Sequence, residues 1–166
     1  TQGFHQTSMA ELAAAADVSV GQIYRYFTSK DAIIGEIVTR IIDFRLQEMK
    51  STSDSSHLCE LLAWRQVLNE DDEALMFEVA AESTRNPAVA QMMADADARL
   101  FSHACQKVQQ QHPHLSDERA RACVELLAVM VEGTSWRRLM PQKASPEQLY
   151  PLYQQFYHLL FDSEAS

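Results

Sequence analysis

The sequence predicts an all-α protein, with a small helix-turn-helix head at the N-terminal end followed by a larger helical body. Only four glycines and five prolines occur among its 166 residues, and Ala, Leu, Glu and Gln are frequent, which favours helices. Apolar residues recur at spacings of three and four along most of the chain, the periodicity of an amphipathic helix. A chain of this length can bury a sizeable core in one domain or in two.

Residues 8–31 predict two short helices joined by a tight turn. Ser8 followed by Glu11 is the pattern of a capping box at the start of the first helix. The chain breaks at 16–18, and Ser19 can cap the second helix. One face of the first helix carries the small and apolar residues expected to pack inward, Met9, Leu12, Ala13 and Ala16.

The second short helix combines an apolar face with an unusually polar one. Ile23 and Phe27 lie four residues apart and point toward a core. Its exposed side carries amide, phenol and guanidinium groups, which suit the base edges and phosphates of the DNA major groove. The alternative is a helical hairpin whose aromatic residues only pack in a core. Against it, Tyr24 and Tyr26 cannot both share the face of Ile23 and Phe27.

This segment resembles the helix-turn-helix of the TetR/AcrR family of transcriptional regulators, over residues 3–37. The resemblance includes Gly-Phe at 3–4, Leu-Ala at 12–13, Val-Ser-x-Gly-x-Ile-Tyr-x-Tyr-Phe at 18–27 and Ser-Lys-Asp at 29–31. A helix-turn-helix pattern alone is weakly specific, but the string Ile-Tyr-Arg-Tyr-Phe-x-x-Lys-Asp is much more so.

The resemblance implies a homodimeric repressor that binds double-stranded operator DNA. In the family a complete helix precedes this motif, usually after a basic arm, so we expect the opening residues of the natural protein to be absent from this sequence. Gly21 would let the backbone approach DNA closely. The residues expected to contact DNA are Thr7, Ser8, Ser19, Gly21, Gln22, Tyr24, Arg25, Tyr26 and Lys30.

The charge of the chain favours a rival interpretation. The formal net charge is −9, the wrong sign for a generic nucleic-acid binder. Residues 1–50 are nearly neutral, with five Lys or Arg and six Asp or Glu. DNA attraction would then depend on a few placed cations and on helix N-termini. The alternative function is therefore a helical effector-binding or protein-interaction module that does not bind DNA.

A longer helix is expected over 31–50, where isoleucines form a stripe wide enough to contact two neighbours. The serine-rich run 51–56 predicts a linker. We therefore expect a DNA-binding domain with its connector helix at 1–50 and an effector-binding and dimerisation domain at 51–166.

The body is expected to contain five further helices. Leucines and Trp64 predict the first, a second apolar segment follows, and Asn86-Pro87 marks a stop and restart before a long amphipathic helix. The histidines on either side of Pro113 predict a solvated turn. Ser116 and Ser145-Pro146 begin the last two helices. The expected ranges are 57–69, 71–84, 89–111, 116–140 and 146–161.

The helix over 120–140 is apolar around much of its surface, so several neighbours must cover it. Leu, Tyr and Phe also dominate 149–161. By resemblance, these two helices of each subunit form a four-helix dimer interface, and residues 120–161 are the expected contact region of the homodimer.

Large, adaptable side chains in the body are candidates for effector binding. The resemblance implies a cavity for a small molecule, and Met and aromatic linings suit apolar or aromatic compounds. An ordinary core would use the same residues. A carboxylate such as Glu82 or Glu132 at the wall would favour a cationic compound instead. The candidates are Trp64, Met76, Phe77, Met93, Phe101, Met130 and Trp136.

The sequence contains no motif for catalysis. A Gly-rich phosphate loop, H-E-x-x-H and G-x-S-x-G are all absent from the sequence, so we expect no enzyme activity and no cofactor. Glu78 and Glu82 lie one turn apart and could act as paired carboxylates, although a solvated helix face is the commoner origin of such a pair.

The cysteines and the hydropathy pattern bear on the compartment. Cys59, Cys105 and Cys123 lack the spacing of a zinc site or a disulfide framework and are expected to be small buried hydrophobes, so no metal is expected. We find neither a signal peptide nor an apolar run long enough to cross a membrane. A cytoplasmic protein without a membrane partner is expected.

Overall fold

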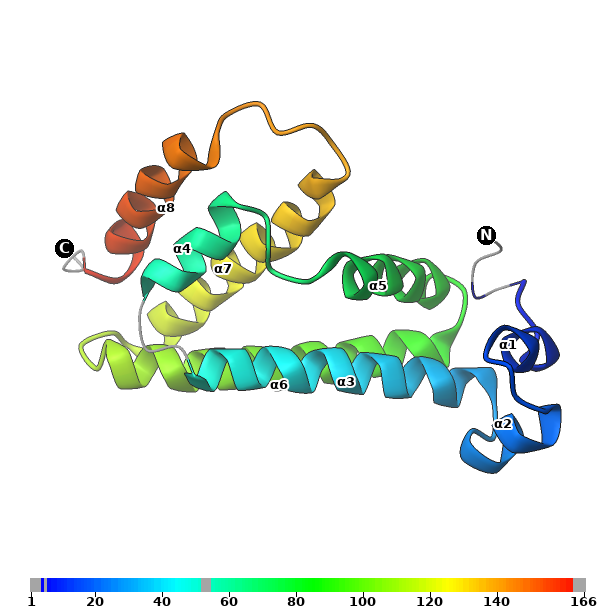
Figure 1. Cartoon of the computed structure of the whole chain (residues 1–166). Helices are drawn as coiled ribbons and strands as arrows, with labels where there is room; N and C mark the ends of the chain where they lie inside the picture. Colours follow the sequence, from blue (N-terminus) through cyan, green and yellow to red (C-terminus); the bar gives the residue numbers. More distant parts are fainter. Residues whose placement is uncertain (1–3, 5, 52–54, 163–166) are drawn as a thin grey trace. The chain divides into compact units, whose positions relative to one another are not determined.

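A computed structural model describes residues 4, 6–51 and 55–162, and this part of the chain is helical and contains no strand (Figure 1). The predicted all-α fold class is confirmed. The helices are α1 Met9–Ala15, α2 Val20–Tyr26, α3 Lys30–Ser51, α4 Ser55–Ala63, α5 Glu70–Ser83, α6 Pro87–Gln111, α7 Asp117–Arg138 and α8 Pro146–Phe161. No helix among these described residues is long and apolar enough to span a membrane.

The chain forms two compact units. Unit 1 comprises Thr1–Arg45 and Glu70–Ala98, and unit 2 comprises Leu46–Asn69 and Arg99–Ser166. Helices α3 and α6 therefore each contribute residues to both units. These units are defined by which residues pack together. The domain boundary after residue 50 was predicted from the composition of the chain, and it stays a prediction.

Both short helices of the head begin with a capping box; the sequence predicted the first box and, for the second helix, only the Ser19 cap. Ser8 and Glu11 form the first box, and Ser19 and Gln22 form the second. Each box satisfies two backbone N–H groups that a short helix cannot pair internally. Helix α1 ends at Ala15, and two residues later Asp17 has a left-handed φ of 53°, a conformation that Asp tolerates better than most residues. Local chemistry thus defines both helices and the turn.

Helix α3 contributes four buried apolar residues to unit 1. Ile34, Val38, Ile41 and Ile42 are buried along it, as the isoleucine stripe predicted. Between α5 and α6, the Asn86 side chain donates to Asp31 (Nδ2 to Oδ1, 3.0 Å), and its Oδ1 accepts the backbone N–H of Ala88 at 3.0 Å. The predicted stop and restart is therefore present, and it is tied to the start of α3.

Helix α4 ends at Ala63, six residues before the predicted end at Asn69. Arg65 has a φ of 53°, and the Gln66 N–H donates to the Leu61 carbonyl at 2.9 Å, which is the bond pattern of a Schellman motif. The Arg65 guanidinium donates to the carbonyls of Arg137 (2.6 Å) and Met140 (3.0 Å). Contacts to the distant end of α7 thus support a turn that nothing near Arg65 in the sequence predicts.

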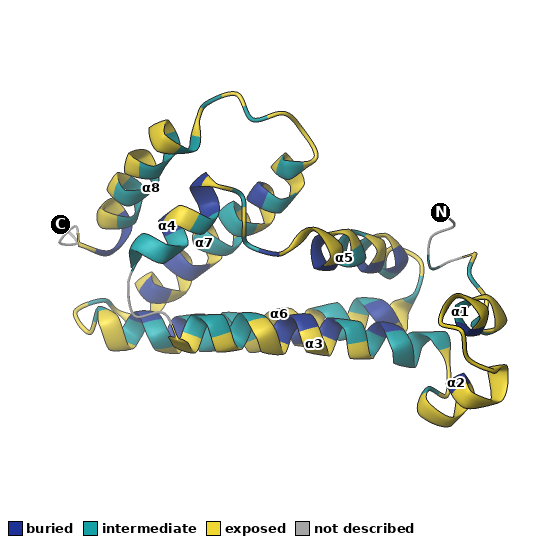
Figure 2. Cartoon of the chain, in the orientation of Figure 1, coloured by how far each residue is buried: buried dark blue, intermediate teal, exposed yellow. Residues whose placement is uncertain are grey.

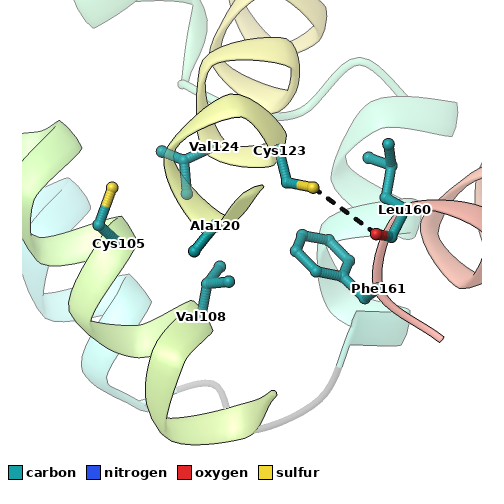
Figure 3. Close-up of a cluster of buried hydrophobic side chains, with 7 residues drawn as sticks. All are labelled: Cys105, Val108, Ala120, Cys123, Val124, Leu160 and Phe161. Carbon is teal, nitrogen blue, oxygen red and sulfur yellow. Dashed lines mark hydrogen bonds between the residues drawn. The ribbon is translucent and has the colours of Figure 1, made fainter. Parts of the chain in front are cut away.

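The core of unit 2 joins α6, α7 and α8 (Figure 3). The Cys123 thiol donates to the Leu160 carbonyl, with Sγ to O at 3.6 Å. All three cysteines are buried thiols without a disulfide, as the sequence predicted. The buried members of this core are Cys105, Val108, Ala120, Cys123, Val124, Leu160 and Phe161.

The histidines around Pro113 do not form the solvated turn that we expected. The His112 ring stacks on Phe161 with ring centroids 4.7 Å apart, and His114 Nε2 lies 2.9 Å from the Phe161 carbonyl oxygen. His112 and His158 both face the carboxylate of Asp162. The expectation was wrong for His112, because the end of α8 covers it, whereas Pro113 and His114 are exposed.

Unit 2 is expected to lose stability on acidification through His112. Burial lowers the pKa of His112, Asp162 opposes this shift, and His114 adds to it. Because the pKa falls on folding, the unfolded chain binds the proton more tightly, so stability is present above the unfolded pKa of about 6.5 and decreases as the pH falls through it. Urea unfolding at pH 7.5 and 5.5 should show a smaller difference for His112→Phe than for the unmodified protein. An unchanged difference would contradict this assignment.

Candidate DNA-binding surface

The outward face of α2 is the candidate site. Ile23 is buried, whereas every other residue of α2 is exposed (Figure 2). Tyr26 is 76% exposed and Tyr24 51% exposed, which is high for aromatic side chains in a folded protein. Phe27 is half-buried. The predicted division of this helix into an apolar and a polar face is therefore confirmed.

Three side chains on this face are available to a ligand. Within the described part of the chain, Tyr24, Arg25 and Tyr26 have no hydrogen bond or ion pair with another residue. Their hydroxyl and guanidinium groups can therefore donate outward without first breaking a contact. A Cβ added at Gly21 would meet nothing within 4 Å, so the surface beside these residues is open.

The capping boxes engage the side chains of three other residues that were predicted to contact DNA. Gln22 Oε1 accepts the Ser19 N–H at 2.8 Å, and Ser19 Oγ accepts the Gln22 N–H at 3.2 Å. Glu11 Oε2 accepts from Ser8 N (2.7 Å) and from Ser8 Oγ (2.8 Å), and these bonds lower the Glu11 pKa. Ser8, Ser19 and Gln22 therefore stabilise the helix starts in this conformation.

Lys30 and Thr7 differ from the exposed set. Lys30 Nζ donates to the Phe4 carbonyl at 2.6 Å, and the Phe4 N–H donates to Glu78 Oε2 at 3.4 Å. Thr7 is half-buried. Lys30 thus ties the segment before α1 to the start of α3, a long-range contact that the sequence pattern could not reveal. Phosphate contacts by Lys30 and Thr7 stay predictions.

Val20 is exposed on the same surface and was absent from the predicted contact set. It is 44% exposed and lies one turn before Tyr24, so the two side chains share a side of α2. The helical period places Val20 on the side of Ile23 and Phe27 as well, so the sequence pattern contained no signal that it is exposed.

The seven predicted effector residues divide between the two units. Met76, Phe77 and Met93 belong to unit 1 and are half-buried. In unit 2, Phe101 packs against the core with the Arg121 guanidinium 5.3 Å from its ring centroid.

The remaining effector candidates of unit 2 differ in exposure. Met130 is half-buried, whereas Trp64 and Trp136 are exposed. Trp64 makes an edge-to-face contact with Tyr150, with ring centroids 6.0 Å apart. Their role in effector binding stays a prediction.

Glu82 on α5 does not lie on the solvated helix face that we expected. Glu82 is only 4% exposed, and it pairs with Arg85 through Nη2 at 2.8 Å and Nε at 2.9 Å. Asp72 is buried and pairs with Arg40. Glu78 is exposed and Glu132 is exposed on α7. The solvated interpretation of Glu82 was wrong because an adjacent arginine neutralises it inside unit 1. Among the described residues, no three His, Cys, Asp or Glu side chains are grouped to hold a metal ion.

Two capped short helices, the second of them exposed and rich in hydrogen-bond donors, have the form of a helix-turn-helix motif. Residues 1–37 match the sequence model of the bacterial regulatory proteins of the tetR family. Over these residues the chain resembles the TetR family of transcriptional regulators.

The similar curated proteins are transcriptional regulators. The HTH-type transcriptional regulator UidR of Escherichia coli K12 is 26% identical over 111 residues, which cover 64% of this chain and 56% of UidR. The matched region thus spans little more than half of that relative's length.

Solved structures share the fold over nearly the whole chain. Salmonella enterica GusR has a TM-score of 0.78 at 22% identity, covering 96% of this chain and 87% of its own. A putative regulator from Pseudomonas aeruginosa PAO1 has a TM-score of 0.80 at 17% identity, covering 97% and 83%. A putative regulator from Saccharomonospora viridis, solved in complex with choline, has a TM-score of 0.68 at 20% identity, covering 95% and 88%.

Proposed function

We propose that this protein is a homodimeric, cytoplasmic repressor that binds operator DNA through α2 and leaves it when a small apolar or aromatic effector binds the body. The observation that carries the DNA-binding part is the exposed set of Tyr24, Arg25 and Tyr26 on α2, which has no partner among the described residues. The three buried thiols are compatible with a reducing compartment.

The net charge of −9 does not exclude this function. The head itself is nearly neutral, and Arg25 is the one cation in α2. An acidic body is repelled by DNA, so only the head can approach the duplex closely. Charge therefore selects the docking face, and the hydrogen-bond donors of α2 supply the contacts.

Exposed apolar side chains on α7 and α8 support a homodimer. Val129 is 57% exposed, and Leu152 and Leu159 are 58% and 62% exposed. Large exposed apolar side chains mark an interaction surface when they form a patch, and Leu152 and Leu159 share one face of α8. Obligate homodimer interfaces bury about 2,000 Å² or more and resemble a divided core, which fits the excess of apolar residues in these two helices.

The pairing of buried carboxylates favours an uncharged effector. Asp72 and Glu82 already have arginine partners inside unit 1, so a cationic ligand would have to displace an arginine from either of them. Half-buried Met76, Phe77 and Met93 offer adaptable apolar surface in the same unit. Because the Saccharomonospora viridis regulator was solved with choline, choline is the cationic probe for comparison.

Helix α3 is the proposed connection between effector and DNA. It starts directly after the head and contributes residues to both units. Two heads of a dimer must enter successive major grooves about 34 Å apart. A tilt of α3 would move one head out of register, provided that the effector binds the DNA-incompetent form more tightly.

The test couples the two ligands. An operator is first selected from the DNA flanking the gene, and compounds including choline are then screened by thermal shift. Each hit is titrated with and without operator. We expect an effector to weaken operator binding about 5–150-fold, a coupling of about 1–3 kcal/mol, and by reciprocity the operator must weaken effector binding by the same factor. Effector binding with no DNA binding at all would support the rival helical module, and hits that ignore DNA would overturn the proposed switch.

A further inference from the structure

The first turn of α2 exposes an apolar side chain, that of Val20. Val20 is 44% exposed, next to Gly21, whose surroundings are open. Valine has a restricted χ1, so its two methyl groups present a nearly fixed surface. Such a side chain can contribute to recognition only by apolar contact.

The side-chain amide of α2, that of Gln22, is already engaged at the start of its own helix. A side-chain amide that reads adenine uses its oxygen and its nitrogen together. Gln22 Oε1 already accepts the Ser19 N–H at 2.8 Å, so in this conformation the amide is held at the start of α2 and only the second lone pair of Oε1 is left to accept from a base. Arg25 is the other polar candidate for base contacts on α2, and an exposed apolar side chain offers a different kind of base contact.

We propose that Val20 is a specificity-determining residue that packs against the 5-methyl group of a thymine in each operator half-site. This inference rests on the proposed DNA-binding function. The thymine methyl is the distinctive apolar feature of the major-groove edges of the four bases. Val20 lies one turn before Tyr24, whose exposed hydroxyl shares its side of the helix. Contacts of Tyr24 to the sugar-phosphate backbone of the DNA would hold α2 in place while Val20 contacts the thymine base.

The experiment removes the methyl group alone. Operators are selected from a random duplex library with the unmodified protein, and each thymine is then replaced by deoxyuridine. We expect one position per half-site to lose about fourfold in affinity, because burial of one such group contributes about 0.8 kcal/mol. The loss should disappear in Val20→Ala. It should persist in Val18→Ala, which removes the other exposed valine beside α2.

The possible outcomes test the role of Val20 separately from the proposed DNA-binding function. Selection of no DNA would overturn both. Tight operator binding that is insensitive to deoxyuridine at every thymine would overturn the role of Val20 and leave DNA binding intact. Deoxyuridine sensitivity that persists unchanged in Val20→Ala would do the same, because another residue would then contact the methyl group.

Discussion

Replacement of Leu159 by glutamate is expected to convert the protein from a dimer to a monomer. Leu159 is 62% exposed on α8, and Leu152 lies seven residues earlier on the same face. A carboxylate there would be desolvated in an apolar interface without a partner, which strongly disfavours association. Analytical ultracentrifugation at micromolar concentration should report half of the mass of the unmodified protein.

Not every apolar residue of the predicted dimer region is suitable for testing this interface. Leu127 and Phe156 belong to the predicted dimer region, but both pack against the core of their own unit, so charging either of them would unfold the subunit. The matched control is Phe44→Glu, since Phe44 is a similarly exposed apolar residue on α3. It should remain dimeric.

Leu159→Glu should also abolish tight operator binding. A monomer binds a single half-site and loses the gain of about 10²–10⁴ that linkage of two sites provides. A monomeric mass for the unmodified protein, or a dimer that persists in Leu159→Glu, would rule out this interface.

Arg25→Ala is expected to weaken operator binding about 5–150-fold, equivalent to about 1–3 kcal/mol for a good contact to a base edge. Arg25 is exposed on α2 and has no partner among the described residues, so its removal should leave the fold unchanged. Arg25→Lys keeps the charge but loses the planar fork. It should restore binding only if Arg25 contacts phosphate.

Fluorescence anisotropy at several salt concentrations separates the two contacts. Loss of a phosphate contact reduces the dependence of log affinity on log salt by about one and affects all sequences equally, whereas loss of a base contact relaxes sequence preference. The control Arg119→Ala removes the same charge from an exposed position on α7 and should bind like the unmodified protein. Equal affinity for Arg25→Ala would show that α2 does not contact DNA through this residue.

The sequence alone determined the elements whose causes are local. The capping boxes at Ser8 and Ser19, the restart at Asn86 and the start of α8 at Ser145 all depend on residues within one turn. Helical periodicity then separated Ile23 from Tyr24 and Arg25. These features were predictable because the interacting groups are neighbours in the chain.

Only the tertiary structure decided how the same residue types are used. Arg65 ends α4 early because carbonyls of Arg137 and Met140, more than seventy positions away, accept from its guanidinium. Lys30 is engaged by the Phe4 carbonyl, and Glu82 is buried beside Arg85. Leu159 is exposed while Leu160 is buried. A sequence pattern gives the faces of a helix, but which face is covered depends on neighbours that folding brings together, and burial and pairing follow from those contacts.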